Sequence, residues 1–308
     1  MRTVLVVLAA LLIVGCGGST GDSYKPKESD AGANTAREER GTNTPATSAD
    51  TAIGETADRG DFEFRVLDVV RDESWRYSDP DDPFGSSTQS YAGEFAVVWY
   101  AIRNTGDAPL NLGKLGDTSA GLLAADTGES FGISENAACA PTQNGGIKNL
   151  QPRGLQLSCL IFDMPADATP ESLEVRFGKG YQPARVDLTT KQPESIEPDE
   201  TLALQYEFSN AGYFDLAYEL FAPSSQQQFT YAQYEAYQRE DWPRLVTSGY
   251  AFPSVTVEGD HATIERVLTS YDTKYRVSDT ARRTQELVRV GGAWRIIARA
   301  EQVSSFTD

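Results

Sequence analysis

The chain has 308 residues, of which 40% are apolar, enough for about two domains with apolar cores. It carries 45 acidic against 27 basic side chains, a formal net charge of −18. No segment forms a basic patch, which argues against nucleic acid as a partner because phosphate contacts require clustered Lys and Arg. The acidic balance also disfavours electrostatic binding to anionic membranes and indicates solubility or adaptation to salt.

The first residues predict export. Arg2 precedes an eleven-residue apolar run, Val4 to Val14, which is shorter than the roughly 20 residues a spanning helix needs. A run of this length is typical of the apolar core of a signal peptide. The stretch Ile13-Val14-Gly15-Cys16 resembles the lipobox of bacterial lipoproteins. That resemblance implies cleavage before Cys16 and a diacylglyceryl group on its thiol.

We therefore expect a lipoprotein signal peptide at residues 1–15 and an anchor to the extracytoplasmic face of the cell membrane. The alternatives are a plain secretory signal with an incidental cysteine, or a retained transmembrane segment. Residues 16–58 are rich in small and polar side chains, with Tyr24 as the one aromatic residue. Such a stretch cannot bury enough apolar surface to offset its chain entropy, so it predicts a disordered tether.

The pattern changes near Asp61. Alternation over Phe62–Val66 predicts a strand, and apolar runs at 94–103 and 155–164 predict two more, with another at 173–177. The segment 104–109, Asn-Thr-Gly-Asp-Ala-Pro, has turn composition. Helical periodicity is absent from this block. Short strands separated by turns favour an antiparallel β-sandwich.

Several of these segments resemble one family. They are Phe95–Leu110, Leu150–Gly154, Phe162–Pro165 and Leu173–Phe177, and they are similar to the core strands and turns of the DUF4352, telokin-like domains. The resemblance implies an immunoglobulin-like sandwich over residues 59–190, on an exported lipoprotein. It implies no catalytic residues, because the family has none to carry over.

Cys139 and Cys159 are the remaining cysteines once Cys16 is lipidated. In an oxidising compartment two cysteines in one domain favour a disulfide. Closing a loop of roughly 20 residues would contribute about 3 kcal/mol in the chain-entropy model. The alternative is a pair of buried free thiols. A catalytic thiol is disfavoured because the single histidine, His261, lies in the other domain and there is no Cys-x-x-Cys motif.

An acidic segment, Asp79-Pro80-Asp81-Asp82-Pro83, has the carboxylates that calcium prefers. The spacing of a helix–loop–helix calcium site is missing, however, and two prolines restrict the backbone. We interpret the segment as a solvated loop, and we expect neither a metal nor a cofactor.

Residues 191–198 have linker composition, and helical spacing follows. Leu202 and Tyr206 are four apart, and Phe214 to Phe221 repeats at three and four residues before Pro223, which predicts the end of that helix. Thr230 and Gln233 form a capping box for another helix.

Strands are expected next, at 255–257 and 262–268. A hairpin is expected from 286–290 and 294–297, joined at Gly291-Gly292. The segments Ala217–Ala222 and Leu287–Ile296 resemble the NTF2-like family, which includes the SnoaL and ketosteroid-isomerase-like proteins. The predicted fold class is therefore an all-β immunoglobulin-like sandwich followed by an α+β NTF2-like cone at residues 199–308. The resemblance implies a pocket that binds a small apolar molecule, supports catalysis, or is filled by side chains.

Chemistry of the ketosteroid-isomerase type needs a carboxylate base facing a donor such as tyrosine. The tyrosines of this region are Tyr206, Tyr213, Tyr218, Tyr231, Tyr234, Tyr250, Tyr271 and Tyr275. No pairing with an acid such as Asp215 or Glu219 follows from the sequence. We expect the helix acids on the solvent side, the tyrosines in the core or at its rim, and His261 exposed after a Gly-Asp turn. Neither a Ser-His-Asp triad nor a His-rich metal site stands out.

The sequence thus predicts a lipid-anchored envelope protein without catalytic residues. Its partners would be the membrane, through the lipid on Cys16, and a small apolar ligand or another envelope protein. The alternatives are an NTF2-like enzyme that acts on a small hydrophobic substrate by acid–base chemistry, and a structural spacer or scaffold. The ligand-binding residues are not determined by the sequence.

Overall fold

The computed structural model describes residues 49–75, 88–112, 121–134, 149–177, 180–241, 244–272 and 274–307. Residues 47–308 form one compact unit. Several sequence predictions lie outside the described residues: the signal peptide at 1–15, the lipidation of Cys16, most of the tether at 16–58, the acidic loop at 79–83, and Cys139 as a disulfide partner. The last residues of the predicted tether are instead ordered, because Thr51–Ile53 and Thr56–Asp58 pair as strands in the two sheets of the sandwich. Among the described residues, every helix is too short or too polar to cross a membrane.

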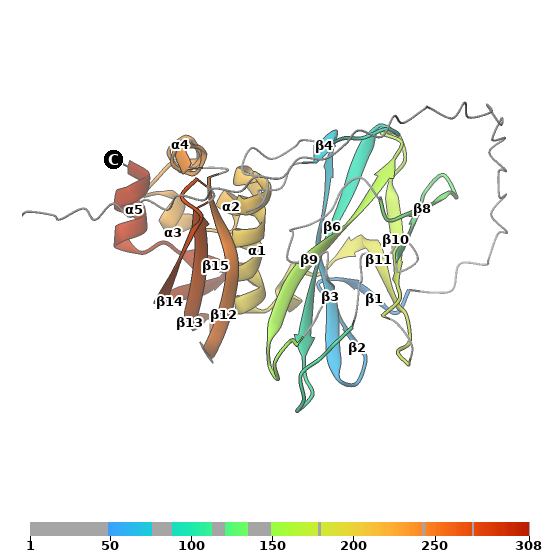
Figure 1. Cartoon of the computed structure of the whole chain (residues 1–308), viewed down its shortest axis with the longest axis horizontal. Coiled ribbons are helices and arrows are strands. Elements are labelled where there is room, and N and C mark those ends of the chain that lie inside the picture. The colour runs from blue at the N-terminus through green and yellow to red at the C-terminus, as the bar shows by residue number, and fades with distance from the viewer. Residues whose placement is uncertain are drawn as a thin grey trace, which may run out of the picture. The chain divides into compact units, whose positions relative to one another are not determined.

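The first half of the unit is a β-sandwich of two sheets (Figure 1). One sheet has the order β2-β3-β6-β9, formed by Thr56–Asp58, Phe62–Asp72, Glu94–Asn104 and Leu155–Met164. The other has the order β1-β11-β10-β7-β8, formed by Thr51–Ile53, Ala184–Lys191, Pro170–Val175, Gly121–Ala125 and Ser130–Gly132. A short pair, β4 (Ser74–Trp75) and β5 (Thr88–Gln89), lies beside them. The pairings are antiparallel as expected, except that β1 runs parallel to β11.

Strand β6 explains how the sandwich connects to the rest of the chain. Its residues Phe95 to Ile102 are all buried. Alternate residues such as Val98 and Tyr100 enter the core between the two sheets, while Val97 and Trp99 enter a second core on the other side. A strand buried on both faces is apolar at every position instead of alternating, which accounts for the unbroken apolar run in the sequence.

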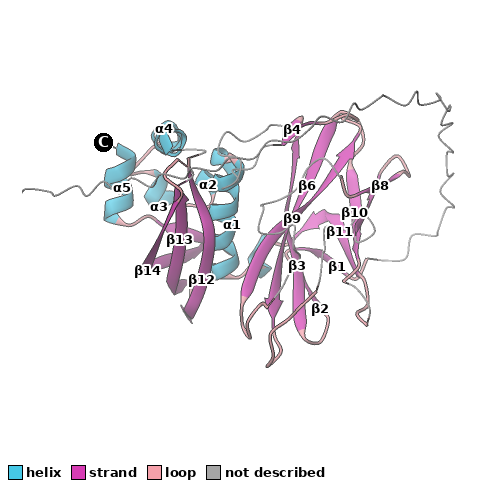
Figure 2. Ribbon diagram, in the orientation of Figure 1, coloured by secondary structure: helices cyan, strands magenta, loops and turns pink. Residues whose placement is uncertain are grey.

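The second half combines helices with one antiparallel sheet (Figure 2). A 3₁₀ turn, η2 (Pro193–Ser195), precedes α1 (Pro198–Ala211), α2 (Phe214–Glu219), α3 (Pro223–Gln226) and α4 (Tyr231–Asp241). The sheet has the order β12-β13-β14-β15, formed by Leu245–Glu258, His261–Asp272, Val277–Val290 and Ala293–Ile297. The last element is α5 (Ala300–Thr307).

Helix α1 is the centre of the second core. Thirteen of its fourteen residues are buried, because one side packs against the outer face of β6 and β9 and another packs against the C-terminal sheet. Phe208 illustrates the first contact: its ring lies 5.6 Å from that of Trp99 at an interplanar angle of 87°. The outer face of the β2-β3-β6-β9 sheet and the helical half therefore share this second core, whereas the core between the two sandwich sheets is separate from it.

Two of the turn and capping motifs predicted from the sequence are confirmed. Thr230 and Gln233 form the predicted capping box, with hydrogen bonds in both directions. Gly291 and Gly292 take φ values of +60° and +88°, which a two-residue hairpin turn of this type requires. Pro223 differs from its prediction: α2 ends at Glu219, and Pro223 begins α3, where a missing N–H costs nothing.

Candidate functional site

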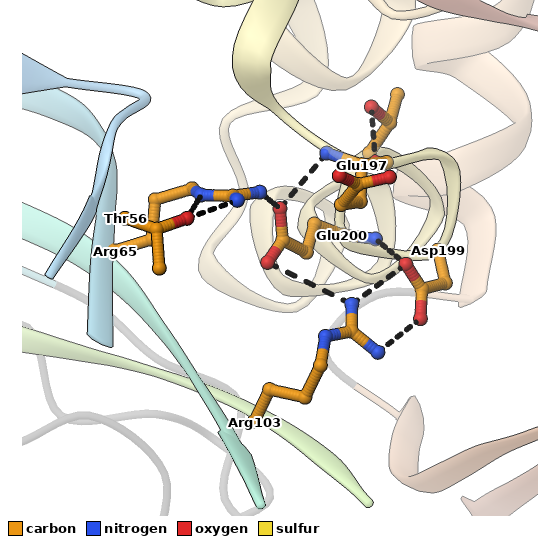
Figure 3. Close-up of polar contacts among 7 residues, drawn as sticks. Thr56, Arg65, Arg103, Glu197, Asp199 and Glu200 are labelled. Carbon is orange, nitrogen blue, oxygen red and sulfur yellow. Dashed lines mark hydrogen bonds and ion pairs between the residues drawn. The ribbon is translucent and has the colours of Figure 1, made fainter. Parts of the chain in front are cut away.

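The N-terminal turn of α1 carries a buried cluster of charges (Figure 3). Glu197 precedes the helix and forms a capping box with Glu200, in which each side chain accepts from the other residue's backbone N–H. Two arginines reach this turn from the sandwich. Arg65 of β3 donates to the Glu200 carboxylate, and Arg103 of β6 donates two hydrogen bonds of 2.9 Å to Asp199. Nη2 of Arg103, one of these two donors, also lies 3.7 Å from Oε1 of Glu200.

The electrostatics of this cluster are those of a structural network. Asp199 and Glu200 are at most 4% exposed, so both charges have left water. Burial raises the pKa of Glu200, whereas the positive charges of Arg65 and Arg103 act to lower it. Burial acts to lower the pKa of Arg103, but the hydrogen bond and charge of Asp199 outweigh it and raise that pKa. Arg65, Arg103, Asp199 and Glu200 each face an opposite charge, so the cluster fixes α1 against the sandwich.

A second polar group lies farther along α1, where the helix faces the C-terminal sheet. Glu207 accepts a 3.0 Å hydrogen bond from the Tyr250 hydroxyl of β12. The Tyr206 hydroxyl accepts from the guanidinium of Arg266 on β13, which also lies 5.6 Å from the Tyr206 ring. Burial raises the pKa of Tyr206, although Arg266 acts against this rise. This hydroxyl is therefore neutral and held by a cation.

Two further contacts keep α1 in register with its neighbours. The Asn210 amide bonds to both the backbone N–H and the carbonyl of Thr247, at 3.0 and 2.9 Å. Gln205 donates to the hydroxyl of Tyr234 at 3.1 Å. These contacts satisfy polar side chains that α1 must bury because both of its sides are covered.

Several predicted positions are confirmed. Asp215 and Glu219 are on the solvent side of α2, and His261 is exposed at the first position of β13 after Gly259-Asp260. Tyr206 and Tyr234 are buried in the core. The tyrosines Tyr213, Tyr218, Tyr250 and Tyr271 are half-buried, whereas Tyr231 and Tyr275 are exposed.

The prediction that the helix acids face solvent is wrong for α1. Asp199, Glu200 and Glu207 are all buried. The sequence contained one usable signal, because a Glu three residues after the residue that caps the helix indicates a capping box. It contained no signal for the arginine partners, which are 135 and 96 residues away from their acids.

Cys159 lies in β9, where it is buried against the core shared with α1. Its predicted pairing with Cys139 stays a prediction because Cys139 is outside the described residues. Across the described ranges, no three His, Cys, Asp or Glu side chains gather in a way that could hold a metal ion.

No protein-family model and no curated protein sequence matches this chain. Among solved structures it is similar to an uncharacterized β-sandwich protein from Clostridium difficile, with 13% identity and a TM-score of 0.33 over 48% of this chain and 99% of the other. It is also similar to the yjhA protein from Bacillus subtilis, with 15% identity and a TM-score of 0.32 over 45% and 99%.

A SEC-C motif containing protein from Rhodopseudomonas palustris matches at 13% identity and a TM-score of 0.31, over 36% of this chain and 80% of that one. Similarity at this level carries no functional assignment. The β-sandwich is established by the two sheets of the chain itself.

Proposed function

We propose that this protein is a lipid-anchored binding protein of the cell envelope. In this proposal Cys16 carries a diacylglyceryl group, the residues between Cys16 and strand β1 form a tether, and the compact unit is a non-catalytic head. Two acyl chains make an anchor stable, because each buried methylene adds about 0.8 kcal/mol. The sandwich would be immunoglobulin-like, as in DUF4352 domains, and the helical half NTF2-like. The order of helices before an antiparallel sheet supports the second assignment.

The observation that carries the proposal is the environment of Tyr206. Acid–base chemistry of the ketosteroid-isomerase type would place a carboxylate across from such a hydroxyl. The hydroxyl of Tyr206 instead meets the guanidinium of Arg266, and the nearby Glu207 is held by Tyr250. This arrangement favours recognition of a ligand over proton transfer.

Two measurements test the proposal. Mass spectrometry of the N-terminal peptide should find Cys16 as the first residue, carrying lipid, and the chain should sediment with membranes. The variant Cys16→Ala should lose both properties. Detection of an unmodified Cys16 still joined to Gly15 would refute the anchor.

For the head, a thermal-shift screen of small molecules should find ligands that stabilise the protein without being converted. Turnover that disappears in a Glu207→Gln variant would favour the enzyme. A screen with no stabilising compound would favour the scaffold alternative.

The predicted disulfide between Cys139 and Cys159 is part of the same proposal, since it requires an oxidising compartment. Thiol titration of the denatured protein, isolated without reductant, should find neither thiol free. Two free thiols would refute the bridge.

A further inference from the structure

Three arginines gather where the C-terminal sheet faces α1. Arg266 of β13 and Arg283 of β14 are directly opposite each other in the antiparallel register, so their side chains project from the same face. Arg299 follows β15. Strand β15 pairs with β14, so Arg299 leaves the sheet beside the strand that carries Arg283. Burial lowers the pKa of Arg299, and the positive charges of Arg266 and Arg283 lower it further. Like charges directly opposite on a sheet destabilise it.

Arg266 is the member whose position demands an explanation. It is 5% exposed, and its polar contact is with the neutral hydroxyl of Tyr206. No ion pair joins it to a carboxylate of the described residues, and its buried Nε has no hydrogen-bond partner. Gln285 lies two residues after Arg283 on β14 and therefore on the same face of the sheet, and its buried Oε1 has no hydrogen-bond partner among the described residues. Buried charges are ordinarily paired because desolvation costs several kcal/mol.

The opposite face of the same strand provides the contrast. Arg282 projects there, and it forms a 2.6 Å ion pair with Glu265. Although the chain has 45 acidic side chains, the exposed Arg282 is paired with a carboxylate, whereas Arg266 is paired with none among the described residues. Arg299 pairs with Glu301, but that carboxylate is 66% exposed and lies on the helix that follows. The cluster of Arg266, Arg283 and Arg299 thus has an excess of positive charge that the described residues leave uncompensated.

We propose that Arg266, Arg283 and Arg299, with the hydroxyl of Tyr206, bind the oxyanion group of a small molecule, a carboxylate or a phosphate. A guanidinium presents a planar fork of donors that matches either group. Tyr206 and Tyr250, with ring centroids 5.9 Å apart, supply an aromatic surface beside the cluster for the apolar part of the ligand. This inference rests on the proposed binding function and specifies the ligand class.

The test is a calorimetric titration of the purified full chain in a non-ionic detergent at constant ionic strength. The probes are benzoate, inorganic phosphate and the neutral benzamide. Benzoate, phosphate or both should bind saturably, and benzamide should bind more weakly than benzoate. Benzoate as the tighter ligand indicates an organic acid, and phosphate as the tighter ligand indicates a phosphorylated molecule.

Arg283→Gln is the principal variant because the Arg283 side chain is exposed and its loss is compatible with folding. Removing one charged donor should weaken anion binding about tenfold or more. Arg282→Gln is the matched control: it removes the same charge one residue away but from the opposite face, and it should leave the affinity unchanged. Arg266→Met should weaken binding further, with circular dichroism as the check of its fold.

The two hypotheses fail in different ways. An equal loss in Arg282→Gln and Arg283→Gln would reduce the effect to net charge and overturn the oxyanion site. Benzamide binding as tightly as benzoate would overturn the site and leave a binding protein. Saturable anion binding followed by conversion of the ligand would support the site and overturn the non-catalytic function. The absence of saturable binding by any probe overturns the site; the thermal-shift screen then decides separately whether the head binds other ligands.

Discussion

The shared core predicts that a substitution in the sandwich and one in the helical half are energetically coupled. Trp99 on β6 is fully buried, and its ring packs edge-on against Phe208 of α1. Trp99→Ala should lower the free energy of unfolding by about 3–5 kcal/mol, the usual cost of removing a large aromatic side chain from a core. Of this loss, the ring pair itself accounts for about 0.5–1.5 kcal/mol.

A double-mutant cycle isolates the pair. The single variants Trp99→Ala and Phe208→Ala and the double variant would be unfolded in urea, followed by far-ultraviolet circular dichroism and by fluorescence. The coupling energy should fall at about 0.5–1.5 kcal/mol. Both signals should follow one transition, because neither half buries its share of the core alone.

The control cycle combines Phe208→Ala with Phe177→Ala. Phe177 is equally buried but lies in the core between the two sandwich sheets. Its effect should add to that of Phe208 within about 0.3–0.5 kcal/mol. Two separate transitions, or the same coupling in both cycles, would contradict a core shared across β6 and α1.

Three more predictions concern charges and the backbone. Glu200→Gln should lower the free energy of unfolding, measured in urea, by about 3–5 kcal/mol because it leaves Arg65 buried without a full counter-charge. The double variant Glu200→Leu with Arg65→Met should recover much of this loss. No recovery would contradict the ion-pair explanation. Gly54→Ala should destabilise the protein by at least about 1 kcal/mol. Gly54 has a φ of +92°, and a Cβ at this position would overlap the carbonyl oxygen of Gln192. An unchanged melting temperature would be inconsistent with that contact. Burial opposes the ionisation of Glu174, but hydrogen bonds from two arginines leave its pKa lowered in the folded protein. The Glu174 carboxylate should therefore contribute up to about 1 kcal/mol of stability above its unfolded-state pKa, and this contribution should be lost as the pH falls through its folded-state pKa. The stabilities of the wild type and of Glu174→Gln should converge in acid, and a constant difference down to low pH would contradict this.

The sequence determined the features that depend on neighbouring residues. The Gly291-Gly292 turn follows from the conformational freedom of glycine, and the Thr230 cap follows from a hydroxyl three residues before a glutamine. The strand over 94–104 was also predictable, because an aromatic and β-branched run favours extended backbone. The lipobox at Cys16 is equally local, and it remains a prediction.

Only the tertiary structure decided what each polar side chain contacts. The acids of α1 look like solvent-facing helix residues until the sandwich covers them and brings Arg65 and Arg103 from distant strands. The pairing of Arg266 with Arg283 depends on the register of a hairpin, and its burial depends on α1 lying across that sheet. Local sequence carries backbone preferences, but burial and charge pairing arise from segments far apart in the chain. The polar contacts on which the proposals rest therefore form only when those segments come together.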